Sequence, residues 1–349
     1  MRVRLCALGA IAFLAVIAAS PATAAPSAAS FALVPQRYDK GLPASQSYFI
    51  AVAHPGDTFT NSVRVQNVGT KTGKALLYAV DGTTGRTSGA VYLDGAKPRQ
   101  DVGAWVALGS RSVTLGPGQS ELVPITVHVP PNARPGDHLG GIVAENAAVT
   151  GATGRGALQI KVRHLTIAAV EVQIPGTTST AFDATAARAG GEHGYQYVYL
   201  RLASTGALTT KPHGHVTVVD ADGREIASRD FRLDTFLPRT AIDYPLLLPG
   251  RALEPGDYRA EVELSYGAAA IGYRRTAGAE TSITRSLPFT VTGREYSTVF
   301  RGANPVKAKP INAKPSGSPP YLLIGVAAIG ALFAGIAVVL VTLRRWPAR

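Results

Sequence analysis

The sequence predicts an all-β protein: two immunoglobulin-like β-sandwich domains in tandem, followed by a C-terminal transmembrane helix. Three observations support this prediction. Apolar and polar residues alternate in short segments through the middle of the chain, which is the period of half-buried strands. Turn-forming Pro-Gly pairs stand directly before several of these segments. Residues 321–343 form an uncharged apolar run that is long enough to cross a hydrocarbon layer of about 30 Å.

Residues 1–24 have the features of a cleaved export signal. Two arginines open the segment, residues 7–19 form its apolar stretch, and Ala22-Thr23-Ala24 supplies the small residues of a cleavage site. Cys6 precedes the apolar stretch, so it does not have the position of a lipoprotein cysteine. A chain cut after Ala24 would contain neither cysteine nor methionine, which excludes thiolate catalysis and cysteine-ligated zinc.

Residues 25–175 are expected to form the first sandwich. Within residues 120–130, apolar side chains occupy every second position from Val123 to Val129, and residues 58–67 show a similar alternation. Such segments recur every 8–15 residues with turn residues between them, which is typical of antiparallel sandwiches.

Residues 176–293 are expected to form the second sandwich. Tyrosines occupy every second position from Tyr195 to Tyr199, and apolar residues do so from Ala260 to Leu264. A Leu-x-Pro-Gly turn lies late in each half, so we place the boundary near residue 175, where each half has the size of one domain. The two turns are Leu115-Gly116-Pro117-Gly118 and Leu253-Glu254-Pro255-Gly256.

The C-terminal part is expected to tether the body to a membrane. Residues 294–320 are rich in Pro and Lys and predict an extended, solvated linker. Residues 321–343 predict the transmembrane helix, and residues 344–349 a basic cytoplasmic tail because Arg344 and Arg345 directly follow the apolar run. The expected location is a single-pass protein of the cell membrane, with its body outside the cytoplasm.

The formal net charge of +12 does not predict a nucleic-acid partner. The excess of basic residues lies mainly in the signal, the linker and the tail. The folded part therefore lacks the concentrated basic footprint that nucleic-acid binding requires.

Several motifs of the first half resemble the WxL-interacting proteins of Gram-positive cell surfaces. The layout also matches that family: a signal, two β-domains, one C-terminal helix and a basic tail. The motifs are Ser47-Tyr48-Phe49, Pro55-Gly56, Val63-Arg64-Val65-Gln66-Asn67, Val113-Thr114-Leu115-Gly116-Pro117-Gly118, Ile125-Thr126-Val127-His128-Val129-Pro130 and Ala133-Arg134-Pro135-Gly136-Asp137-His138-Leu139-Gly140-Gly141-Ile142-Val143.

This resemblance implies that the first domain binds peptidoglycan and that the second binds other surface or host partners. A sandwich is expected to meet such a ligand with loops or a sheet edge. The candidate segments are residues 81–99 and 132–141. Arg134, Asp137 and His138 are the candidate binding residues, because they could pair with the carboxylates and amides of peptide stems.

No catalytic motif accompanies these features, so we expect neither an enzyme nor a cofactor. Residues 85–89 resemble a nucleophile elbow, but the serine stands one place late, at Ser88. The glycine-rich residues 151–156 are not followed by a helix-forming pattern, which a phosphate-binding loop would require.

A metal site is an alternative hypothesis for the second half. His213 and His215 are two residues apart on an expected strand, so their imidazoles point to the same face and could contribute to a copper or zinc site. The fold would have to supply a third ligand, for example His193 or Asp220. Two exposed histidines where a strand begins are the simpler interpretation, and we predict no metal.

Together these observations predict a membrane-anchored, non-enzymatic binding protein of the cell surface. Its expected partner is peptidoglycan or a protein attached to the cell wall. The alternatives are an accessory membrane protein for the export or assembly of surface proteins, and an extracytoplasmic metal-binding protein.

Overall fold

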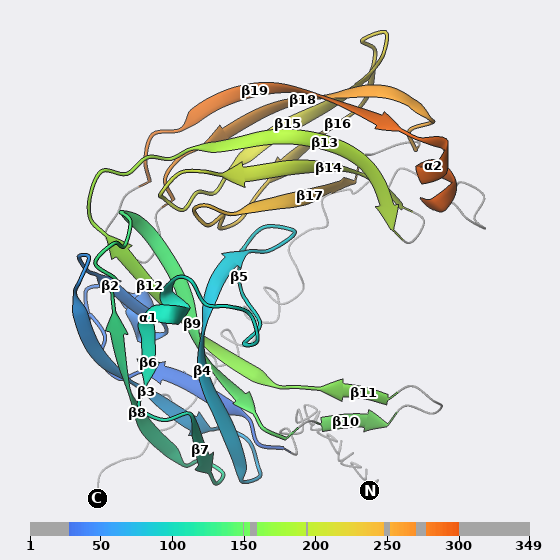
Figure 1. Cartoon of the computed structure of the whole chain (residues 1–349). Helices are drawn as coiled ribbons and strands as arrows, with labels where there is room; N and C mark the ends of the chain where they lie inside the picture. Colours follow the sequence, from blue (N-terminus) through green and yellow to red (C-terminus); the bar gives the residue numbers. More distant parts are fainter. Residues whose placement is uncertain are drawn as a thin grey trace, which may run out of the picture.

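The computed structural model describes residues 28–148, 150–153, 159–192, 195–247, 252–269 and 277–299. These residues form almost only β-structure, arranged as two groups of strands (Figure 1). The all-β prediction is confirmed. The expected signal, transmembrane helix and basic tail lie outside the described residues, and within the described ones no helix is long and apolar enough to cross a membrane.

The first sandwich pairs a four-stranded sheet with a larger one. In the smaller sheet the order is β1 (Phe31–Pro35), β3 (Thr58–Asn67), β8 (Ser120–His128) and β6 (Val106–Leu108). In the larger sheet the order is β2 (Phe49–Val52), β12 (Leu165–Ile174), β9 (Gly136–Asn146), β4 (Gly73–Thr84) and β5 (Ala90–Tyr92), with β7 (Ser112–Leu115) also paired to β4. The remaining elements are the helical turns η1 (Pro43–Gln46) and α1 (Val102–Trp105) and the hairpin β10 (Thr150–Thr153) and β11 (Gln159–Val162).

The alternation read from the sequence determines which face of each strand is buried. Val63 on β3 pairs with Val123 on β8, and both side chains are at most 1% exposed. Ile125 and Val127 continue the same face into the core, which also receives residues of the larger sheet such as Val172. Burial of these side chains between the two sheets holds the first sandwich together.

The second sandwich has its own core. On β14, Val198, Leu200 and Leu202 face this core, so the tyrosines at 195, 197 and 199 lie on the outer face of their sheet. One sheet has the order β13 (Phe182–Glu192), β14 (Tyr195–Ser204) and β17 (Ala241–Leu247), and the other has the order β16 (Glu225–Arg232), β15 (His213–Asp220), β18 (Gly256–Tyr266) and β19 (Thr281–Val291).

The described chain ends in a short helix, α2 (Gly293–Val299), where the sequence predicted the start of an extended linker. A capping box explains the difference. The Thr292 hydroxyl accepts a hydrogen bond from Glu295 N (3.1 Å), and the Glu295 carboxylate accepts one from Thr292 N (3.0 Å). The Thr-x-x-Glu spacing is a helix-start signal visible in the sequence. Most of the expected linker, from residue 300 onward, lies outside the described residues.

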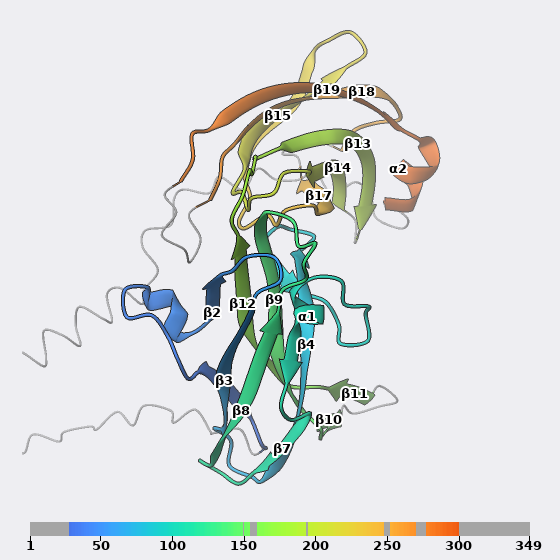
Figure 2. The same ribbon diagram turned by 60° about the vertical axis from the view of Figure 1, so that its left-hand side comes forward.

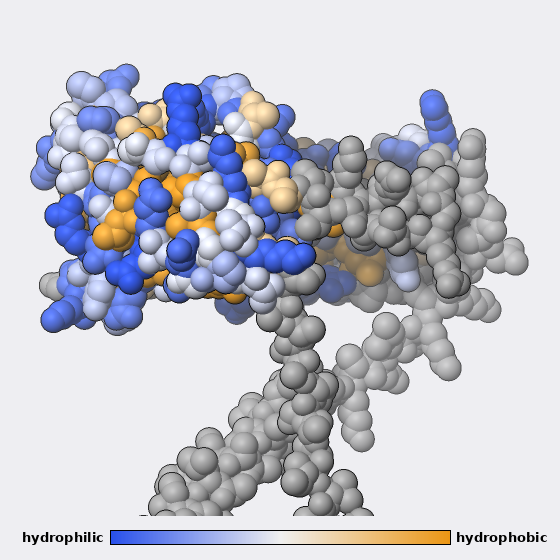
Figure 3. Space-filling view, turned by 90° about the horizontal axis from the view of Figure 1, so that it is seen from below, coloured by the Kyte–Doolittle hydropathy of each residue, from blue (hydrophilic) through white to orange (hydrophobic). Residues whose placement is uncertain are grey.

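The second sandwich lies across one end of the first, with its strands running roughly crosswise to β9 and β12 (Figures 1 and 2). β9 and β12 of the first sandwich run up towards the sheet β13–β14–β17 of the second (Figure 2). Seen from below, hydrophobic residues form patches among hydrophilic ones (Figure 3).

Replacing Ile125 by alanine tests the first core. Ile125 is 1% exposed on β8, whereas Leu122 on the same strand is 50% exposed. We expect Ile125→Ala to lower the free energy of unfolding by about 2–5 kcal/mol. Leu122→Ala, the matched control, should change it by less than about 0.5 kcal/mol. Chemical denaturation measures both, and equal losses in the two variants would contradict this assignment of the buried face.

Candidate binding site between the domains

Asp137, at the start of β9, joins the two sandwiches by hydrogen bonds. Its carboxylate accepts a hydrogen bond from Thr209 N (2.8 Å), and its backbone N donates one to Ala207 O (2.9 Å). The preceding residue is Gly136 at φ +125°, where a side-chain Cβ would lie 2.2 Å from Ala207 O. Glycine at 136 therefore allows the two backbones to approach, and Asp137 then joins them.

A second group of hydrogen bonds joins β4 to the loop before β17. The Thr84 hydroxyl lies 2.6 Å from the Thr240 hydroxyl and accepts a hydrogen bond from Leu237 N (2.9 Å). Arg239 donates to Pro135 O (3.2 Å), which ties the same loop to the turn before β9. The end of β4 and the turn before β9 thus both hold the loop of residues 235–240 over the end of the first sandwich.

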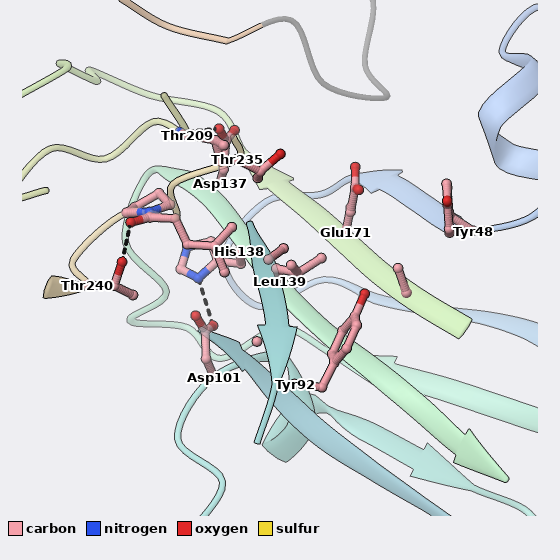
Figure 4. A pocket seen from close by; sticks show the side chains of 15 residues that line it. Tyr48, Tyr92, Asp101, Asp137, His138, Leu139, Glu171, Thr209, Thr235 and Thr240 are labelled. Carbon is pink, nitrogen blue, oxygen red and sulfur yellow. Dashed lines mark hydrogen bonds and ion pairs between the residues drawn. The ribbon is translucent and has the colours of Figure 1, made fainter. Parts of the chain in front are cut away.

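A cavity of about 310 Å³ lies where these elements meet. Figure 4 shows its side chains, which come from both sandwiches. The lining contains carboxylates, hydroxyls and one imidazole, and it contains neither lysine nor arginine. The lining residues are Tyr48, Gly82, Ala90, Tyr92, Asp101, Asp137, His138, Leu139, Ala169, Glu171, Thr209, Thr235, Leu237, Pro238 and Thr240.

The floor of the cavity is the outer face of the larger sheet of the first sandwich. Glu171 on β12 pairs with Leu139 on β9, and Ala169 lies two residues earlier on the same face. A side-chain Cβ at Gly82 would meet Leu139 at 2.9–3.0 Å, so the sheet is tightly packed here. Small residues leave room above the sheet into which the longer Glu171 side chain extends.

Two tyrosines stand beside Glu171 on the same side of the sheet (Figure 4). Tyr92 pairs with Gly82 at the sheet edge, and its ring lies against Gly141, where a Cβ would be 3.0 Å away. Burial raises the pKa of Tyr92 to about 12, and the negative charge of Glu171 contributes to this shift. Tyr48, which is 44% exposed, forms the outer side.

Glu171 has an unusual environment for a carboxylate. Its Oε2 atom is buried and has no hydrogen-bond partner among the described residues. Burial, and secondarily the negative charge of Asp137, raises the pKa of the Glu171 carboxyl above its usual range. Buried carboxylates are normally hydrogen-bonded or paired because an unpaired one is costly. An unpartnered carboxylate at a cavity wall is therefore suited to a ligand that donates hydrogen bonds.

His138 is fixed within the protein. Its Nε2 donates to Arg134 O (2.8 Å), its Nδ1 lies 2.7 Å from the Asp101 carboxylate, and its ring packs on Trp105 with 4.8 Å between centroids. The buried Asp81 carboxylate holds Asp101 in place by accepting hydrogen bonds from backbone N–H groups of residues 100, 101 and 103.

These contacts revise the picture of the three candidate binding residues. Asp137 and His138 line the cavity, but both are buried and take part in hydrogen bonds within the protein. Only Arg134 is exposed, and it is not part of the lining. Their assignment as ligand contacts stays a prediction.

The sequence analysis missed Glu171 as a site residue, whereas Tyr92 lies within the candidate segment 81–99 but was not singled out. A signal for Glu171 was available, because it is the one charged residue in the mainly apolar strand Leu165–Ile174. Nothing local distinguishes Tyr92, whose position at the cavity depends on the pairing of β5 with β4.

The histidine pair lies on one face of β15 as expected. His215 Nδ1 is 2.7 Å from the Asp230 carboxylate, and His213 Nε2 is 4.0 Å from Glu280. Asp220 instead accepts hydrogen bonds from the N–H groups of its own turn. His193 lies outside the described residues, and within them no three His, Cys, Asp or Glu side chains are grouped so as to hold a metal ion.

Comparisons with known proteins do not identify a family. No family model matches the chain, and no curated protein matches it. One solved structure that matches is a chaperone–tip adhesin complex of CFA/I fimbriae biogenesis, at 9% identity over 72% of this chain and 98% of that chain, with a TM-score of 0.34. A second is the class 5 fimbriae chaperone CfaA, at 9% identity over 73% of this chain and 99% of that chain, with a TM-score of 0.32. A third is a complex of the Salmonella enterica SafA pilin with the SafB chaperone, at 11% identity over 75% of this chain and 96% of that chain, with a TM-score of 0.33. Similarity at these scores carries no argument about this chain, and the resemblance to WxL-interacting proteins stays a prediction.

Replacing Asp137 tests the junction. Asp137→Ala should leave the buried Thr209 N–H without an acceptor, at a cost of about 1–3 kcal/mol. Asp137→Asn keeps an acceptor oxygen and should lose less. Thermal unfolding, together with hydrogen exchange at Thr209, measures the effect. Asp222→Ala in the exposed β15–β16 turn is the control, and an Asp137→Ala protein as stable as this control would contradict the role of Asp137.

Proposed function

We propose that this chain is a non-enzymatic binding protein of the cell surface that holds peptidoglycan, or a protein attached to the wall, at the junction of its two sandwiches. The observation that carries the proposal is the cavity between the domains with its unpartnered carboxylate, Glu171. Ligand sites are found preferentially at domain interfaces, where a few polar groups converge.

The chemistry of the cavity suits the peptide part of peptidoglycan. Stem peptides are extended and polar, and they offer amide and amine donors to carboxylates and hydroxyls. The cavity presents Glu171, Tyr92 and Thr235 among apolar groups such as Leu139. The motif resemblance of the first sandwich supports the same ligand class, because strands β4, β5, β9 and β12 of that sandwich form most of the cavity.

The rest of the proposal concerns location. The export signal of residues 1–24 and the apolar run of residues 321–343 would place the two sandwiches outside the cytoplasm, on a membrane anchor. A tethered site needs little affinity, because neighbouring copies on one membrane can bind one polymer at several points.

Co-sedimentation with purified cell wall tests this proposal, using the full chain in detergent. Ala90→Trp would place an indole in the cavity from the edge strand β5, so we expect it to reduce the pelleted fraction several-fold. Val91→Trp is the matched control, because adjacent strand residues point to opposite faces and Val91 is 41% exposed.

Equal recovery of the wild-type protein with and without wall would overturn the proposal. The alternative to pursue would then be an accessory role in the export or assembly of surface proteins. Equal retention of the two tryptophan variants would place wall binding elsewhere than in the cavity.

A further inference from the structure

We propose that the cavity between the sandwiches binds a primary ammonium group at the end of a flexible chain, with Glu171 as its counter-ion and Tyr48 and Tyr92 as its walls. This inference rests on the proposed function and deepens it, because it names the group of the ligand that is recognised. The ligand we favour is the free amine of a wall stem peptide.

The charge of the cavity favours a cation. Three carboxylates line it, from Asp101, Asp137 and Glu171, and the lining holds no lysine or arginine. Asp101 pairs with His138 (2.7 Å), and Asp137 accepts the hydrogen bond from Thr209 N. Glu171 is the carboxylate whose buried oxygen is left for a ligand. Arg239 lies close to Asp101 and Asp137, so Glu171 is the carboxylate on which the preference for a cation depends.

The geometry favours a small donor-rich cation. An ammonium group has three N–H donors, and the cavity offers it the Glu171 carboxylate and the hydroxyls of Tyr48 and Tyr92, which stand on the same side of the sheet (Figure 4). Two aromatic rings also line the cavity, and an ammonium close to an aromatic ring is attracted to its face. A neutral apolar ligand would leave Glu171 unsatisfied.

The size of the cavity favours a side chain. A volume of about 310 Å³ lies at the lower end of the range for small-molecule sites. It admits an alkyl amine with part of its peptide. Leu139, Ala169 and Leu237 supply apolar surface for the methylene groups of such a chain.

The first experiment measures binding of two probes to the full chain in detergent by calorimetry. The probes are Nα-acetyl-lysine amide and its Nε-acetylated form, which differ in the ammonium group. We expect the charged probe to bind at least tenfold more tightly. Glu171→Gln should remove this preference. Glu263→Gln, an identical charge change at an exposed site on β18, should keep it. Equal binding of the two probes, or a preference that survives Glu171→Gln, would overturn the inference.

The second measurement separates lost binding from lost folding. Because Glu171 Oε2 is buried and has no hydrogen-bond partner among the described residues, Glu171→Gln without ligand should melt at the same temperature as the wild type or higher. The wild type should lose stability relative to this variant as the pH rises and Glu171 ionises. A carboxyl whose pKa is higher in the folded than in the unfolded protein makes folding less favourable when it is ionised. The titratable groups that face Glu171 are Asp137 and Tyr92, with Tyr48 beside them (Figure 4). A lower melting temperature for Glu171→Gln would show a structural role and contradict the proposal.

The third experiment distinguishes this inference from the proposed function. Wall is offered either intact or with its free amines acetylated. Retention on intact wall but not on acetylated wall supports both the proposed function and the ammonium inference. Equal retention on both walls overturns the ammonium inference and leaves the proposed function standing. Retention on neither wall overturns the proposed function. If the lysine probe still binds in that case, the stem peptide is excluded as the source, and a protein lysine replaces it.

Discussion

The arrangement of this protein depends on how β9 begins. Gly136 allows the backbone of the first sandwich to reach Ala207 of the second, and Asp137 then joins the two with one donated and one accepted hydrogen bond. Because β9 is the central strand of the larger sheet, this contact fixes the whole outer face of that sheet beneath the second sandwich. The cavity is the space left between that face and the loop of residues 235–240. Asp137 therefore has a structural role that precedes any role in binding.

The chemistry of the cavity follows from the same arrangement. On a free sandwich Glu171 would stand on an open sheet face, where water would solvate its carboxylate. Burial at the cavity wall removes much of that water, and no protein donor replaces it at Oε2 among the described residues. The raised pKa of Glu171 expresses this cost. Stability given up at one side chain is common at binding sites, because a ligand that supplies the missing donor and charge recovers it only when bound.

Local patterns predicted most of the fold, and long-range pairing determined most of the site. Alternation placed Val123, Ile125 and Val127 inside because a strand has two faces and one is buried. The same rule could not show that Glu171, on the outer face of β12, lines a cavity, since residues of the other sandwich such as Thr235 and Leu237 complete that cavity. Asp137 was predicted as a ligand contact, and its burial could not be foreseen for the same reason: its partner, Thr209, lies in the other sandwich. The helix α2 was missed although its Thr292–Glu295 capping box is local and legible.

The central claim is that Glu171 binds a cationic ligand, and the ionisation of this one carboxyl tests the claim most directly. Selective ¹³C labelling of glutamate side chains, with Glu171→Gln for assignment, allows the pKa of Glu171 to be followed by NMR in the full chain. The account predicts a pKa above the usual range in the free protein and a clear fall when Nα-acetyl-lysine amide saturates the cavity. A Glu171 pKa that is ordinary in the free protein, or that does not change with the amine, would contradict the account.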